Sequence, residues 1–131
     1  MRIGVGLLAL VLLASCESNE ITNELVQSDS INIQFANSPT HSMSTDKDAI
    51  KKLAGFIGRK EKTLPLECEI KPSGMIFFYL DGRSKHEVTF TDLSQKCRYF
   101  ITKLNDKTVY TVVSNEAADF LAAIRDGKST Y

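Results

Sequence analysis

Two tight-turn signals in the second half of the chain constrain the fold more than any other feature. Asp81-Gly82 and Asn105-Asp106 each separate two segments that are rich in apolar residues. Asp-Gly is a favoured pair at the centre of a β-hairpin, and Asn and Asp both tolerate the left-handed backbone that tight turns use. Such a connection joins antiparallel strands and is too short for a parallel crossover. We therefore predict a predominantly antiparallel sheet.

The segments around these turns have the patterns of strands. Most of them alternate apolar and polar residues, which is typical of half-buried strands, and Cys68 falls on an apolar face. The continuous apolar run at 75–80 predicts a central strand covered on both faces, while 72–74 and 37–44 are expected to be a turn and a loop. The expected strands form a β-meander of about five to six members, at about 31–36, 64–70, 75–80, 86–91, 97–104 and 107–113.

Two helices are expected to pack on this sheet. Apolar residues recur at helical spacing over about 46–57, after an approximate capping box at 45–48. Ser114 or Asn115 can cap a last helix, whose expected buried residues are Ala117, Phe120, Leu121 and Ile124. Helices packed on an antiparallel sheet define the α+β class.

The first residues of the chain are typical of an export signal. Arg2 precedes an almost wholly apolar run at 3–14. This run is shorter than the roughly 20 apolar residues that span a bilayer. Leu13-Ala14-Ser15-Cys16 resembles the lipobox of bacterial lipoproteins, and that resemblance implies cleavage before Cys16, lipidation of its thiol and attachment to a membrane surface. An ordinary secretory signal with an incidental cysteine is the alternative.

The sequence behind Cys16 predicts three parts of the chain. Residues 1–15 are the expected lipoprotein signal peptide, 16–29 a polar tether, and 30–131 a single α+β domain. A tether of about a dozen extended residues would reach about 40 Å from the bilayer. Ile21, Leu25 and Ser28 would share one face of a helix, so a short helical turn is the alternative for this stretch.

The cysteine count fits an exported protein. If Cys16 carries lipid, Cys68 and Cys97 remain as an even pair, and disulfides persist outside the reducing cytosol. The simplest assignment is a Cys68–Cys97 disulfide that staples the sheet. A reactive or metal-binding pair of thiols is the alternative, but no Cys-x-x-Cys spacing or neighbouring histidine favours it.

The chain offers few groups for catalysis. His41 and His86 are its only histidines and belong to no cluster of metal ligands. A triad of a serine with His86 and Asp92 would lack the Gly-x-Ser-x-Gly motif, and a solvated strand face explains Glu67 and Glu69. We predict no catalytic residue, no metal site and no cofactor. Basic and acidic side chains number 16 each, which argues against a nucleic-acid partner.

These features favour an envelope lipoprotein that binds another protein as an inhibitor or immunity module. The alternatives are a structural or assembly subunit of an envelope complex and, ranked third, an enzyme acting on wall or glycan. The outer membrane is expected rather than the inner membrane. Phe77 and Tyr79 share one strand face. If the helices cover only one side of the sheet, the other side exposes aromatic area of the kind that marks partner sites.

Overall fold

Three helical segments pack against a six-stranded sheet. The computed structural model describes residues 20–39, 41–59, 71–91 and 98–127, and the numbers of helices and strands refer to these residues. The helices are residues 20–26, α2 (Lys47–Ile57) and α3 (Asn115–Arg125). The strands are β1 (Ser30–Phe35), β2 (His41–Ser44), β3 (Pro72–Leu80), β4 (Arg83–Thr91), β5 (Tyr99–Leu104) and β6 (Lys107–Val112). The predicted α+β class is confirmed.

Every strand pairing in the sheet is antiparallel, and the strands lie in the order β2-β1-β3-β4-β5-β6. The β3–β4 hairpin turns at Asp81-Gly82 and the β5–β6 hairpin at Asn105-Asp106, with φ between 51° and 77° at all four residues. Positive φ at both central residues characterises the type I′ turn, whose twist matches that of paired strands. Both predicted hairpins are therefore confirmed.

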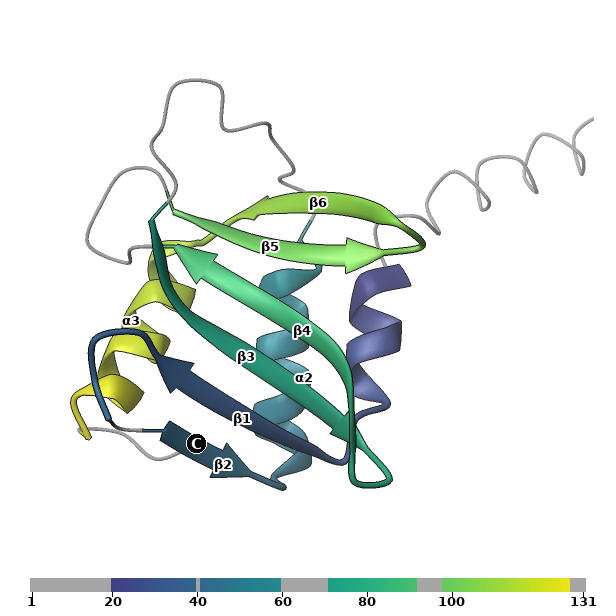
Figure 1. Cartoon of the computed structure of the whole chain (residues 1–131), viewed down its shortest axis with the longest axis horizontal. Helices are drawn as coiled ribbons and strands as arrows, with labels where there is room; N and C mark the ends of the chain where they lie inside the picture. Colours follow the sequence, from purple (N-terminus) through teal and green to yellow (C-terminus); the bar gives the residue numbers. More distant parts are fainter. Residues whose placement is uncertain (1–19, 40, 60–70, 92–97, 128–131) are drawn as a thin grey trace, which may run out of the picture.

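The three helices lie on the same side of the sheet, behind it in the view of Figure 1. Facing them, alternate residues of the central strands are fully buried, among them Ile33, Ile76 and Val88. Leu53 of α2 and Leu121 of α3 are equally buried. Removal of apolar surface from water contributes about 25 cal/mol per Å², so this layer between helices and sheet is the main source of stability.

Side-chain caps determine where α2 and α3 begin. The Asp46 carboxylate accepts a hydrogen bond from the Asp48 amide at 2.9 Å, and the Ser114 hydroxyl accepts one from the Ala117 amide at 3.1 Å. Each cap contributes about 1 kcal/mol because it satisfies an N–H group that the helix leaves unpaired. Ser114 is one of the two predicted caps of α3. The capping box expected to begin at Thr45 is wrong by one residue.

Residues 41–44, expected to belong to a loop, form the edge strand β2. This strand pairs with β1, with His41 opposite Gln34 and Ser44 opposite Ile31. Its sequence has no apolar alternation, and Met43 is 61 % exposed. An edge strand needs backbone partners on one side only, so a short polar segment can form it without a recognisable pattern.

The Pro72-Ser73-Gly74 segment, expected to be a turn, is the beginning of β3. Gly74 lies directly opposite both Phe35 of β1 and Phe90 of β4, whose rings meet edge to face at 5.7 Å. A Cβ atom at this position would collide with the Gln34 carbonyl oxygen and with the Phe90 ring. Glycine is required at this position for close packing rather than for a turn.

The segment expected to be a tether, 16–29, is part of the fold from residue 20 onward. Residues 20–26 are helical, and Ile21 and Leu25 are only 2 % and 1 % exposed. Ser28 is also buried. The tether interpretation is therefore wrong for this part, and the helical alternative is correct. Two apolar residues on one face of a short helix suffice when a sheet and a second helix are present to bury them.

Several predictions concern residues outside the described ranges. These predictions are the strand at 64–70, the carboxylates Glu67 and Glu69, the candidate triad residue Asp92, lipidation at Cys16, and the Cys68–Cys97 disulfide.

Two glycine substitutions test how tightly helix 20–26 packs on α2. A Cβ atom at Gly58 would collide with Thr22, whereas one at Gly55 meets nothing within 4 Å. Gly58→Ala is expected to lower the free energy of unfolding by about 1–3 kcal/mol, the usual cost of overpacking. Gly55→Ala should raise it by about 0.5–1 kcal/mol, because alanine is the better helix former. Urea denaturation measures both, and an unchanged stability of Gly58→Ala would contradict the close contact.

Candidate functional site

The side of the sheet that faces away from the helices carries a continuous set of half-exposed side chains. Figure 1 views the sheet from this side. Successive residues of a strand point to opposite faces, so the neighbours of the buried core residues point outward on this side. We call this surface the open face. It includes Asn32, Gln34, Met43, Met75, Phe77, Tyr79, Glu87, Thr89, Tyr99, Ile101, Lys103, Tyr110 and Val112.

One row of directly paired residues crosses all six strands on the open face. Neighbouring strands lie about 4.8 Å apart, so the row extends over about 24 Å. Directly opposite side chains on one face of a sheet contact each other, which makes the row a continuous surface. From β2 to β6 its members are His41, Gln34, Met75, Thr89, Ile101 and Tyr110.

Two aromatic pairs lie on the open face. The rings of Phe77 and Tyr79 on β3 are 6.5 Å apart between centroids, and those of Tyr99 on β5 and Tyr110 on β6 are 6.4 Å apart in an edge-to-face arrangement. All four residues are half-buried. Tyrosine combines apolar area with a hydroxyl that can bond to a partner, and it is enriched in protein interfaces for this reason. Phe77 and Tyr79 are thus partly exposed, so the strand at 75–80 is not fully covered on both faces as its apolar run predicts.

Charged side chains of both signs interrupt this apolar surface. Glu87 is directly opposite Phe77. A hollow of about 430 Å³ beside it is lined in part by Met75, Ile101 and Lys103. A carboxylate at the centre of the face repels phosphate groups, and a nucleic-acid site needs a predominantly basic surface. The chemistry of the open face thus fits a mixed apolar and polar partner.

Asn32 is a buried polar residue on the open face. It lies directly opposite Met43 and Phe77 and is 8 % exposed. Its side-chain oxygen is buried and has no hydrogen-bond partner among the described residues. An unpaired buried acceptor costs about 1–3 kcal/mol. The open face therefore contains a hydrogen-bond acceptor that the described part of the protein does not satisfy.

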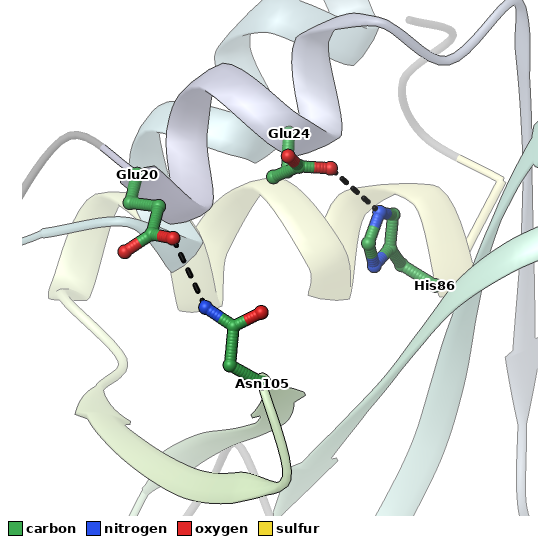
Figure 2. A network of polar contacts seen from close by, with 4 residues as sticks. All are labelled: Glu20, Glu24, His86 and Asn105. Carbon is green, nitrogen blue, oxygen red and sulfur yellow. Dashed lines mark hydrogen bonds and ion pairs between the residues drawn. The ribbon is translucent and has the colours of Figure 1, made fainter.

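On the side of the sheet opposite to the open face, a polar network joins helix 20–26 to the sheet (Figure 2). His86 Nε2 lies 3.5 Å from Glu24 Oε2, and Asn105 donates a hydrogen bond from Nδ2 to Glu20 Oε1 at 3.1 Å. Both carboxylates come from the helix, while the histidine and the asparagine come from β4 and from the β5–β6 turn. The network links the helix to β4 and to the β5–β6 turn.

Among the described residues, no serine and carboxylate complete a nucleophilic triad with His86. Ser28 lines the same hollow of about 220 Å³ as His86 and Glu24, but no hydrogen bond joins the Ser28 and His86 side chains. Asp92, the carboxylate of the expected triad, lies outside the described residues.

The two histidines lie on different strands: His41 on the edge strand β2 is opposite Gln34, while His86 on β4 faces Glu24 and also borders the hollow beside Glu87. Within residues 20–39, 41–59, 71–91 and 98–127, no three His, Cys, Asp or Glu side chains converge as metal ligands. No helix in these ranges is both long enough and apolar enough to cross a membrane.

Comparisons of the chain with known protein families, with curated proteins and with solved structures give no match. The open face is therefore interpreted from its own geometry and chemistry.

Replacement of Asn32 tests whether its amide is unsatisfied. Asn32→Leu keeps a similar volume and removes the buried acceptor, so the free energy of unfolding is expected to rise by about 1 kcal/mol. Gln34→Leu, on the same strand and face but exposed, is the matched control and should change stability by less than about 0.5 kcal/mol. Urea denaturation measures both. A loss of stability in Asn32→Leu alone would show that the amide makes bonds that stabilise the fold.

Proposed function

We propose that this chain is an exported lipoprotein, anchored to a membrane of the bacterial envelope through Cys16, whose open face binds a protein partner. The observation that carries the proposal is the row of paired side chains across six strands, together with the two half-buried aromatic pairs beside it. The chain acts as an inhibitor or immunity module, which works by covering its partner and needs no catalytic group of its own.

The shape and chemistry of the open face favour a protein over a small ligand. Sites for small molecules are concave and enclose most of the ligand, whereas the hollow of about 430 Å³ is only one part of a surface that crosses six strands. Tyr79, Tyr99 and Tyr110 supply amphipathic contact area, and Glu87 and Lys103 supply charges of both signs. Aromatic residues combined with polar neighbours are typical of protein interfaces.

The anchor is supported by the sequence at 1–16. A short apolar run that ends in Leu13-Ala14-Ser15-Cys16 fits a lipoprotein signal better than a membrane-spanning helix. Each buried CH₂ of a lipid chain contributes about 0.8 kcal/mol, so one chain binds a membrane marginally and two or three bind it firmly. We propose the outer membrane as the location.

The disulfide between Cys68 and Cys97 is proposed from the sequence alone, since both cysteines lie outside the described residues. With Cys16 lipidated, these two cysteines are an even pair in an exported chain, where disulfides form and persist.

Photo-crosslinking in cells tests the binding surface. Benzoylphenylalanine in place of Phe77 or Tyr110 is expected to give a discrete adduct with one envelope protein. The same residue in place of Phe120, a half-buried aromatic on the helix side, is the matched control and should give none. Adding Tyr110→Lys to the Phe77 probe should lower the yield at least about tenfold, as expected for loss of an interface aromatic. Equal yields from all three positions would contradict the proposal, and adducts with several subunits of one complex would favour the assembly alternative.

Reduction tests the disulfide. A bridge that closes a loop of about thirty residues is expected to contribute about 3–4 kcal/mol, so dithiothreitol or Cys68→Ala should lower the urea midpoint markedly. Cys68→Ala with Cys97→Ala should then be insensitive to dithiothreitol. A mass map of non-reduced exported protein that shows both cysteines free would exclude the bond.

A further inference from the structure

We propose, building on the lipid anchor proposed above, that the domain is held against the bilayer with its β5–β6 turn facing the lipid headgroups. The open face would then stand at the membrane surface. This inference combines the fixed position of helix 20–26 with the short length of chain between that helix and Cys16.

Helix 20–26 is packed into the domain rather than laid on it. Ile21 and Leu25 are almost fully buried against the core. The Thr22 hydroxyl donates a hydrogen bond to the Ala54 carbonyl of α2 at 3.3 Å. The space for Thr22 exists only because residue 58 is glycine. These contacts fix the helix in one position relative to the sheet.

The first residue of the helix lies beside the β5–β6 turn. Glu20 accepts a hydrogen bond from the Asn105 side chain at 3.1 Å, and Glu24, one helical turn later, pairs with His86 at 3.5 Å (Figure 2). The place where the chain leaves the described fold toward Cys16 is therefore next to Asn105.

At the other end of helix 20–26, the residues that connect it to β1 are themselves hydrogen-bonded. The Ser28 amide donates to the Leu25 carbonyl at 3.1 Å, and the Asp29 amide donates to the Tyr79 carbonyl of β3 at 2.9 Å. The Asp29 carboxylate also accepts from the Asp81 amide in the β3–β4 turn at 3.0 Å. The chain thus passes directly from helix 20–26 into β1, and both ends of the helix are fixed.

The chain between Cys16 and Glu20 is too short to release the domain from the membrane. Four residue steps of extended chain cover about 14 Å at most. A lipid at Cys16 lies in the bilayer, so Glu20 and the adjoining β5–β6 turn must stay close to the headgroups. The end of α3 lies at the opposite end of the molecule (Figure 1).

This orientation places the open face within reach of the bilayer. The row of paired residues crosses β5 and β6 at Ile101 and Tyr110, which are paired with each other. Ile101 is four residues before Asn105, a distance of about 13 Å along a strand. A partner that contacts these two residues must itself be present near the membrane surface.

Charge does not account for the orientation. Near the turn, the basic residues are balanced by acidic ones, so no basic patch of described residues attracts anionic lipid; the basic residues are Lys85, Lys103 and Lys107, and the acidic ones Glu20, Glu87 and Asp106. The tether alone sets the distance, and the orientation should therefore be insensitive to salt.

Quenching of a fluorophore by lipids that carry a nitroxide on the headgroup tests the orientation. The lipidated full-length protein would be placed in vesicles of phosphatidylethanolamine and phosphatidylglycerol, with the fluorophore attached through an encoded azide residue at Asp106 or Arg125. Quenching at 106 is expected to exceed that at 125 at least about threefold, because the short tether keeps the turn near the headgroups. The ratio should stay unchanged between about 0.1 and 1 M salt.

Two variants complete the test. A flexible Gly/Ser linker of about 15 residues between residue 19 and Glu20 has a typical span of about 21 Å and should bring the ratio close to one. The same linker added after Tyr131 should leave it unchanged. Equal quenching at 106 and 125 in the lipidated protein without a linker overturns the orientation and leaves the anchor intact. Vesicle binding and palmitate labelling that persist in Cys16→Ala overturn the anchor itself.

Discussion

The packing of all three helices on one face of the sheet is the constraint on which the other features depend. Strand residues alternate between faces, so each residue buried under the helices fixes the outward direction of its neighbours. A shift of one residue in the register would exchange the two faces. The type I′ turns at Asp81-Gly82 and Asn105-Asp106 oppose such a shift in the two hairpins. The register that forms the core therefore also forms the open face.

Helix 20–26 contributes to the core and to the orientation through different interactions. Burial of Ile21 and Leu25 stabilises the fold by about 1.5–3 kcal/mol for each side chain. The contacts of Glu20 with Asn105 and of Glu24 with His86 are exposed or half-exposed, and surface pairs of this kind contribute about 0–1 kcal/mol. Apolar burial therefore holds the helix, while the polar contacts align its first turn with the β5–β6 turn.

The sequence predicts the elements whose own residues show a recognisable turn signal or apolar spacing. The hairpins follow from local turn chemistry, and α2 and α3 follow from apolar residues at helical spacing with a cap in front. The strand β2 could not be predicted, since its His-Ser-Met-Ser sequence pairs through the backbone alone. In the sequence, Gly74 resembles a turn residue. Phe90, whose ring leaves no room for a Cβ atom at position 74, is distant along the chain, so the sequence does not show this requirement.

The sequence could predict the open face only conditionally. The shared face of Phe77 and Tyr79 is visible in the sequence, but its exposure depends on which side the helices cover. The ring contact of Tyr99 with Tyr110 and the burial of Asn32 depend on the register between strands. The packing of helix 20–26 is a similar case. Its sequence is largely polar, and its two buried apolar residues, Ile21 and Leu25, become decisive only when α2 and the sheet form a surface that can bury them.

The proposed anchor would reduce the affinity that the open face must supply. Two molecules confined to the same membrane meet at a raised effective concentration, so a weak contact in solution can become an occupied contact at the surface. The open face mixes apolar and charged groups: Met75, Thr89 and Ile101 connect the β3 aromatic pair to Tyr110, and Glu87 and Lys103 border this connection. Charged groups beside an apolar surface limit non-specific association.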